Sequence, residues 1–204
     1  MNIDQVITPG FKEELINNIN AIGIPTSNIE CILLEGSALY LKQPNDLDFK
    51  VILKRYMPKA ETMRSFDICN HKVECCYYTF NDWANVYKYK KDAQYITESS
   101  DMICIYGDDS KFVRHDVVNN KELQKYVLNV FDKNFFNYKE ENKNSYKMDD
   151  KRLWNFLLFA FKVKNKSNNL TAEQLIKLQM AHDLKIGKES HRLLFNELVT
   201  LILN

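Results

Sequence analysis

The chain has 204 residues, of which 45% are hydrophobic and 27% are charged, and its 28 basic and 27 acidic residues leave a formal net charge of +1. This composition is typical of a folded globular protein of one domain or two small ones. The near-zero charge gives no support for a long nucleic-acid track, although a local basic patch is compatible with it. No apolar run is long enough for a membrane span, and the N-terminus lacks a signal-peptide pattern, so we expect a cytoplasmic protein.

The five cysteines also favour a reducing compartment, because their number is odd, no Cys-x-x-Cys occurs, and most lie in apolar runs. A zinc site has to be weighed, since Cys69, His71, Cys75 and Cys76 fall within eight residues. Adjacent residues of a strand face opposite ways, so Cys75 and Cys76 could not easily share one tetrahedral ion. Buried, reduced cysteines are the better interpretation.

The first elements of the chain are a helix and a strand. Apolar residues recur at helical spacing over residues 11–22, bracketed by Pro9-Gly10 and Gly23. A short apolar run rich in β-branched residues then predicts a buried strand over residues 29–34. We expect the helix to cover a sheet that contains this strand.

A Gly36-Ser37 turn ends this strand and leads into a short helix that Ser37 would cap, and a second strand covers residues 46–53. Side chains alternate along a strand, so Asp46 and Asp48 point the same way. Two such carboxylates are costly without a cation between them, and hard divalent cations prefer oxygen ligands. Together with a turn whose backbone N–H groups could contact phosphate, they predict a metal-dependent phosphoryl-transfer site.

The next segments, residues 65–69 and 72–80, read as a β-hairpin. Glu74 lies in an apolar run of its second strand, where a buried charge needs a partner, and a metal site would supply one. Glu74 is therefore our candidate for a third carboxylate, and Asp67 on the first strand of the hairpin remains the alternative.

These pieces resemble the DNA-polymerase-β-like nucleotidyltransferase superfamily, in particular its minimal, aminoglycoside-type members. The family signature is a hydrophobic strand ending in Gly-Gly or Gly-Ser, a short helix, a strand with Asp-x-Asp or Asp-x-Glu, and a third carboxylate on a later strand. Residues 32–37 (Ile-Leu-Leu-Glu-Gly-Ser) and 46–49 (Asp-Leu-Asp-Phe) match it, within a resemblance that covers the first half of the chain. Glu35 departs from the signature, because an apolar residue is usual before the glycine.

The resemblance implies transfer of a nucleoside monophosphate from an NTP, with ATP favoured, to an acceptor hydroxyl and release of pyrophosphate. Asp46, Asp48 and Glu74 would be catalytic and would bind two Mg²⁺ ions, with Mn²⁺ as an alternative. Gly36 and Ser37 would contact the substrate. The acceptor could be a small molecule, a protein or a tRNA end, a partner protein could regulate the site, and a long nucleic acid is not expected.

Three features follow the hairpin. Asn81 would cap a helix that runs to about residue 91, and a strand over residues 102–106 ends at Gly107. Asp108 and Asp109 are adjacent and diverge, so they indicate a turn rather than a second metal pair.

From about residue 119 the pattern becomes helical, with apolar stripes over residues 123–131, 153–161 and 193–202. Thr171 and Gln174 form a capping box that opens a further helix, which Gly187 would close. A charged linker covers residues 139–147. The lysines from Lys162 to Lys166 indicate a solvated helix end rather than a phosphate site.

We therefore expect an α+β protein. A nucleotidyltransferase-type mixed β-sheet domain flanked by helices would cover residues 1–118, and a C-terminal helical bundle would cover residues 119–204. The active cleft would lie between the two. The alternatives are a catalytically inactive binding or scaffold protein of the same fold, and a nucleic-acid-binding module.

Overall fold

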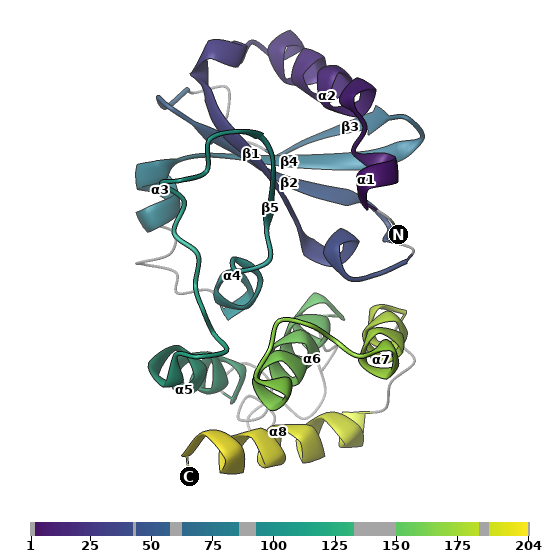
Figure 1. Ribbon diagram of the computed structural model, residues 1–204, viewed down its shortest axis with the longest axis vertical. Coiled ribbons are helices and arrows are strands. Elements are labelled where there is room, and N and C mark those ends of the chain that lie inside the picture. Colours follow the sequence, from purple (N-terminus) through teal and green to yellow (C-terminus); the bar gives the residue numbers. More distant parts are fainter. Residues whose placement is uncertain are drawn as a thin grey trace, which may run out of the picture. The chain divides into compact units, whose positions relative to one another are not determined.

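The computed structural model describes residues 3–42, 44–57, 63–85, 93–132, 150–183 and 188–203. It confirms a mixed β-sheet flanked by helices, followed by C-terminal helices that contact one another (Figure 1). The chain divides into a sheet unit, Met1–Lys90 with Asp101–Val113, and a helical unit, Lys91–Ser100 with Arg114–Asn204.

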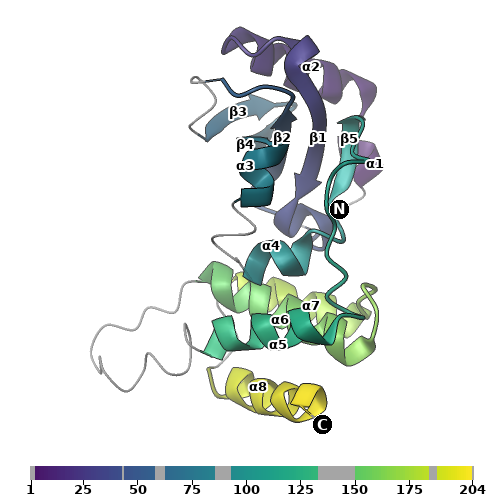
Figure 2. The same ribbon diagram turned by 90° about the vertical axis from the view of Figure 1, so that its left-hand side faces the viewer.

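The sheet unit is built on a five-stranded sheet in the order β3-β4-β2-β1-β5 (Figure 2). Its strands are β1 (Ile29–Glu35), β2 (Leu47–Leu53), β3 (Arg64–Ile68), β4 (His71–Thr79) and β5 (Ile103–Gly107). Strands β2 and β4 run parallel, and the other neighbouring strands run antiparallel. The predicted strands and the hairpin are confirmed to within about two residues at their ends.

One face of the sheet is covered by helix α2 (Pro9–Ala21), which matches the predicted first helix (Figure 1). Thr8 caps it by accepting a hydrogen bond from the Phe11 backbone N–H at 3.2 Å. The rings of Phe11 and Phe49 pack with their centroids 6.1 Å apart. The buried cluster includes alternate residues of β2, namely Leu47, Phe49, Val51 and Leu53. Side chains alternate along a strand, so Asp48 and Lys50 belong to the opposite face.

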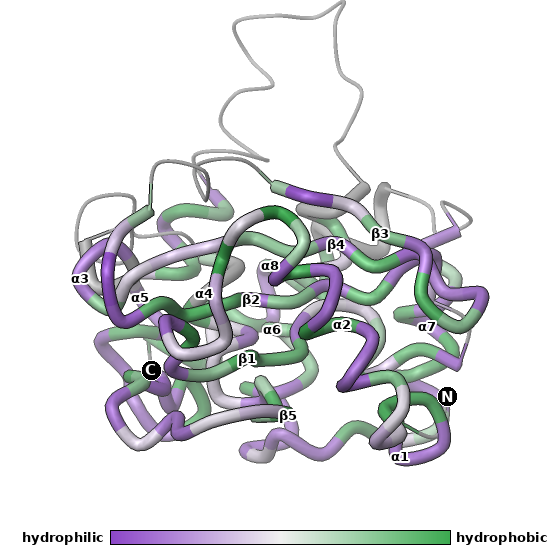
Figure 3. Tube along the Cα trace, turned by 90° about the horizontal axis from the view of Figure 1, so that it is seen from above, coloured by the Kyte–Doolittle hydropathy of each residue, from purple (hydrophilic) through white to green (hydrophobic). Residues whose placement is uncertain are grey.

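Strands β1 and β2 are hydrophobic over most of their length (Figure 3). Both faces of their central residues are buried, since Leu33 and Ile52 are as inaccessible as Ile32 and Val51. Continuous hydrophobic strands of this kind belong at the centre of a sheet covered on two sides. The polar residues at the ends of these strands are therefore exceptions that require an explanation.

The turn after β1 differs from the prediction. The chain forms a 3-10 turn, η2 (Gly36–Leu39), instead of a helix that begins after Ser37. Gly36 has a φ of +75°, which lets the chain turn directly at the end of β1. Ser37 consequently lies inside the turn rather than at its cap, and its carbonyl group accepts a hydrogen bond from the Tyr40 N–H at 3.1 Å.

The helix after the hairpin, α3 (Phe80–Asn85), begins two residues earlier than a cap at Asn81 predicts. Its cap is Thr79, whose hydroxyl accepts from the Asp82 N–H at 3.1 Å, while the Asp82 carboxylate accepts from the Thr79 N–H at 3.1 Å. This reciprocal pair satisfies two N–H groups at the helix start, which explains why Asn81 is not the cap. The predicted continuation to residue 91 lies outside the described residues.

The helical unit contains five described helices, with α6 in contact with most of the others. They are α4 (Ala93–Glu98), α5 (Lys121–Phe131), α6 (Asp150–Asn165), α7 (Ala172–His182) and α8 (Lys188–Leu203). Helix α6 contacts α4, α7 and α8, and α5 contacts α4 and α8 (Figure 2). The capping box of Thr171 and Gln174 at the start of α7 is confirmed. The predicted linker at 139–147 and the predicted stop at Gly187 lie outside the described residues.

Lys162 on α6 contradicts the prediction of a solvated helix end. Its side chain is fully buried, and its ammonium group donates to the Thr97 carbonyl group at 2.7 Å. Helix α6 is buried on every side over this stretch, so a lysine there needs an internal acceptor. Thr97 is near the C-terminal end of α4, where carbonyl groups lack helical partners and attract cations. In the described parts of the chain, no helix is long and apolar enough to cross a membrane.

Gly107 provides a test of the sheet packing. It has a φ of +78°, and a Cβ atom there would lie 2.0 Å from the Glu30 carbonyl oxygen. We expect Gly107→Ala to lower the free energy of unfolding by more than about 2 kcal/mol. Alanine is strained at this positive φ, and its Cβ atom would clash with the Glu30 backbone. Urea unfolding measures the change.

The matched control for this substitution is Gly10→Ala in helix α2. A Cβ atom there would have Thr8 Oγ1 as its nearest neighbour, at 4.0 Å. Alanine should stabilise this helix position by about 0.5–1 kcal/mol. Equal stability of the two variants would contradict the close approach of β5 to β1.

Candidate functional site

Acidic residues lie side by side across the centre of the sheet, on the face opposite α2. Glu35 on β1 is the register partner of Asp48 on β2, and Asp48 is the register partner of Glu74 on β4. Partners on adjacent strands lie about 5 Å apart and point to the same face. The strand order therefore gathers carboxylates that are distant in the sequence.

Asp46, Asp48 and Glu74, which we call the acidic triad, each offer a carboxylate oxygen, and these oxygens lie within 4.8 Å of one another. Asp46 immediately precedes β2, so the strand begins one residue later than predicted, yet its carboxylate still meets that of Asp48. The alternative carboxylate, Asp67, is not part of this group and is the register partner of Lys72.

The triad suits a hard divalent cation. Mg²⁺ binds oxygen at about 2.0–2.1 Å, so two ligands of one ion lie at most about 4.2 Å apart. Oxygens that already lie within 4.8 Å of one another reach that spacing with small side-chain adjustments. All three residues are half-buried, which leaves room for substrate oxygens to complete the coordination.

The predicted Gly36-Ser37 turn lies against the triad. A Cβ atom at Gly36 would lie 2.8 Å from Asp48 Oδ2, and the φ of +75° is also one that favours glycine. Glycine is required here because it lets the backbone pass directly beside the carboxylate. The structure therefore brings together the predicted residues Gly36, Asp46, Asp48 and Glu74, with Ser37 next in the chain.

Glu35, the residue that departs from the signature, forms an ion pair with Lys50. The side chain of Lys50 is 1% exposed, and that of Glu35 is 11% exposed. The Lys50 ammonium group also lies 5.9 Å from the centre of the Tyr78 ring. A buried ammonium group requires a hydrogen-bond acceptor or an opposite charge beside it, and the Glu35 carboxylate supplies both, which explains an acidic residue at position 35.

Lys72 is a second cation at the site. Its Nζ atom lies 2.5 Å from Glu74 Oε1 and 3.9 Å from Asp46 Oδ2. The hydrogen bond from Lys72 to Glu74, followed by the charge of Glu74, raises the pKa of Lys72 above its ordinary value. Unlike Lys50, the Lys72 side chain is 53% exposed.

Sequence reasoning missed both lysines, although a signal was present. Lys50 follows Asp48 by two residues, and Lys72 precedes Glu74 by two residues. In a strand, residues two apart share a face, so each lysine was placed beside a carboxylate by the same alternation that paired Asp46 with Asp48.

Other candidate ligands in the sequence lie outside the triad: Asp108 is in a turn, and Cys75 and Cys76 are on strand β4. Asp108 accepts hydrogen bonds from the backbone N–H and hydroxyl of Ser110, which lower the pKa of Asp108, as expected of a turn residue. Cys75 is in the core, where burial raises the pKa of its thiol to about 12. Cys76 lies on the other face of β4, so the two adjacent thiols diverge.

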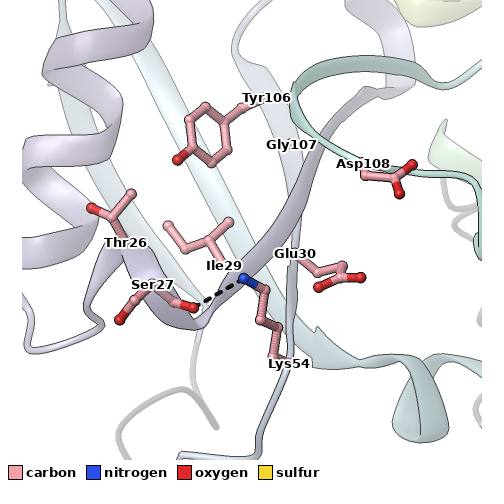
Figure 4. A pocket seen from close by; sticks show the side chains of 8 residues that line it. All are labelled: Thr26, Ser27, Ile29, Glu30, Lys54, Tyr106, Gly107 and Asp108. Carbon is pink, nitrogen blue, oxygen red and sulfur yellow. Dashed lines mark hydrogen bonds between the residues drawn. The ribbon is translucent and has the colours of Figure 1, made fainter.

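A separate hollow of about 460 Å³ lies at the opposite ends of the same strands (Figure 4). Its walls include the start of β1, the residue after β2 and the end of β5, and Lys54 donates to the Ser27 carbonyl group across it at 3.1 Å. It is lined by Thr26, Ser27, Ile29, Glu30, Lys54, Tyr106, Gly107 and Asp108. The acidic triad lies at the start of β2 and on the adjoining part of β4, and its residues do not line this hollow.

No protein-family model matches the sequence, and no curated protein is significantly similar to it. A shared fold would not establish a function by itself.

The buried pair of Glu35 and Lys50 gives a stability prediction. Removing one partner, by Glu35→Gln or Lys50→Met, leaves the other charge buried, so each single variant should lose about 3 kcal/mol of unfolding free energy. The double variant buries no unpaired charge and should be at least about 1 kcal/mol more stable than the sum of the single effects predicts. Urea unfolding of the four proteins gives this coupling energy.

The exposed pair of Lys164 and Glu197, with Nζ and Oε2 3.0 Å apart, is the control. Its side chains are 55% and 61% exposed, and its removal should cost less than about 1 kcal/mol. Strictly additive effects at Glu35 and Lys50 would show that the buried contact does not couple them.

Proposed function

We propose that this protein is a metal-dependent nucleotidyltransferase of the DNA-polymerase-β-like type. It would transfer a nucleoside monophosphate from an NTP to an acceptor hydroxyl and release pyrophosphate. The observation that supports this most is the meeting of Asp46, Asp48 and Glu74 within 4.8 Å, beside a glycine turn that touches Asp48. The order in the chain, Gly-Ser, Asp-x-Asp and then a third carboxylate, is also that of the family signature.

The acidic triad would hold the metal, two Mg²⁺ ions or Mn²⁺, because these hard cations prefer carboxylate oxygens and share sites with phosphates. Such ions, when bound, neutralise the triphosphate and lower the pKa of the attacking hydroxyl group. The donor set present, three half-buried carboxylates, is suited to this role.

The remaining work falls to residues of the chain itself. Gly36 has no side chain, so phosphate groups can approach the backbone beside Asp48, and the Ser37 hydroxyl would donate to a phosphate oxygen. The acceptor oxygen attacks the α-phosphorus atom, the bond from that atom to the bridging oxygen breaks, and pyrophosphate leaves. Glu74 would accept the proton of the acceptor hydroxyl. Positioning and charge neutralisation would supply most of the rate.

The proposal includes three kinds of acceptor molecule. The net charge of +1 argues against a long nucleic acid, which would need a clustered basic surface. A small molecule, a protein or a tRNA end fits a near-neutral protein of this size.

A catalytically inactive nucleotidyltransferase-type scaffold is the second candidate. One observation favours it, since the ammonium group of Lys72 already lies 2.5 Å from Glu74. The ammonium group of a lysine can take the place of a metal ion among carboxylates. A site that is permanently neutralised in this way would not need metal.

Calorimetric binding of each NTP with Mg²⁺, to the wild type and to Asp48→Asn, tests the proposed site. We expect the wild type to bind at least one NTP only when metal is present. The variant should bind it more than about tenfold more weakly, because it lacks one metal ligand. Its fold should persist, since removal of one carboxylate from a crowded acidic group relieves repulsion.

Asp67→Asn is the control, because it removes a carboxylate on β3 outside the triad. It should leave nucleotide affinity unchanged. Equal affinity in the wild type and Asp48→Asn would sink the site assignment. Absence of nucleotide binding to the folded wild type would favour the scaffold.

A further inference from the structure

Two lysines face the carboxylates, and they differ in their freedom to move. Lys50 is 1% exposed and forms an ion pair with Glu35, so it is a fixed part of the sheet. Lys72 is 53% exposed, and its ammonium group pairs with two members of the triad, Glu74 at 2.5 Å and Asp46 at 3.9 Å. Its long side chain can therefore leave the carboxylates without exposing any core.

We propose that Lys72 is a built-in competitor of the metal ion. Its ammonium group neutralises Glu74 and Asp46 until a divalent cation displaces it, and the displaced ammonium group then pairs with the phosphates of the incoming nucleotide. This inference rests on the proposed nucleotidyltransferase function and concerns the regulation of the same site.

Charge explains why displacement is required. The Glu74 and Asp46 oxygens that Lys72 contacts belong to residues whose carboxylates form the candidate metal site. A cation bound to the triad would stand within a few ångströms of the ammonium group, and like charges at that distance repel by about 1 kcal/mol even in water. A metal ion therefore binds the triad more weakly while the Lys72 ammonium group is paired with the same carboxylates.

The phosphates of the nucleotide remove this conflict. A triphosphate carries negative charge to the same place and accepts hydrogen bonds from an ammonium group. With nucleotide present, Lys72 exchanges a carboxylate partner for a phosphate partner. Binding of metal alone is consequently disfavoured, whereas binding of metal together with nucleotide is favoured. The triad would therefore bind metal mainly when the nucleotide is present.

The test measures Mn²⁺ binding to wild type and Lys72→Met by electron paramagnetic resonance of the free ion, with and without the NTP that the calorimetry selects. Without nucleotide, Lys72→Met should bind Mn²⁺ about fivefold more tightly than the wild type, because the like charge is gone. At saturating Mn²⁺, its affinity for the nucleotide should be about fivefold weaker, because a phosphate partner is lost. Methionine keeps the length of the side chain, and the position is exposed enough for the fold to persist.

Two further variants separate this role from general charge effects. Lys72→Arg keeps the cation and should retain both wild-type affinities. Lys111→Met removes a 69% exposed lysine whose Nζ atom lies 3.1 Å from Glu30 Oε1, away from the triad, and it should change neither affinity. An effect of Lys111→Met equal to that of Lys72→Met would overturn the inference.

The outcomes also separate this inference from the proposed function. Unchanged or weaker Mn²⁺ binding by Lys72→Met, in a protein whose wild type binds Mn²⁺ with nucleotide, overturns the competitor role and leaves the function standing. Tighter Mn²⁺ binding without any nucleotide binding supports the competitor role and refutes the function. Tighter Mn²⁺ binding with unchanged nucleotide affinity overturns the phosphate contact. Failure of both proteins to bind Mn²⁺ overturns the inference together with the metal site.

Discussion

The parallel pairing of β2 with β4 is the constraint on which the candidate site depends. It sets Glu74 directly beside Asp48, and the antiparallel pairing of β1 with β2 sets Glu35 on the other side of Asp48. A shift of one residue between β2 and β4 would send Glu74 to the face that α2 covers. The hydrophobic residues of the core fix this register, because Leu47, Phe49, Val73 and Cys75 must all face α2. The packing of one face of the sheet thus determines the chemistry of the other.

Such a concentration of carboxylates is costly, and the fold offsets the cost inside the sheet. Lys50 lies two residues after Asp48 on the same face of β2, and its buried ammonium group pairs with Glu35. An ion pair buried to this degree contributes little net stability, since both partners lose their hydration. The pair acts through its electrostatic field, because a fixed cation beside Glu35, Asp48 and Glu74 lowers the repulsion among these carboxylates. Glu35 therefore belongs to the structure that supports the site, although it stands next to Gly36 in the sequence.

Local patterns predicted the five strands and the longer helices, whereas contacts between distant segments decided the details. Asp46 and Asp48 lie two apart on one strand, so alternation alone predicted that they would meet. The third carboxylate was open between Glu74 and Asp67, because the answer depends on which strand pairs with β2. Lys162 was misjudged for the same reason, since a helix surface is solvated only if nothing packs on it, and α4 supplies both cover and an acceptor. Helix α4 itself is too short to carry a readable periodicity.

The contrast between Lys50 and Lys72 supports the proposal that lysine serves two purposes at one site. Burial holds Lys50 in place, so its charge is a permanent part of the field around Asp48. Lys72 is exposed, so under the proposed role its charge at Glu74 would depend on what else binds there. A triad compensated only by buried cations would bind metal weakly with or without substrate. One compensated by an exposed cation can release that cation when metal and phosphate arrive together, which couples occupation of the site to the presence of substrate.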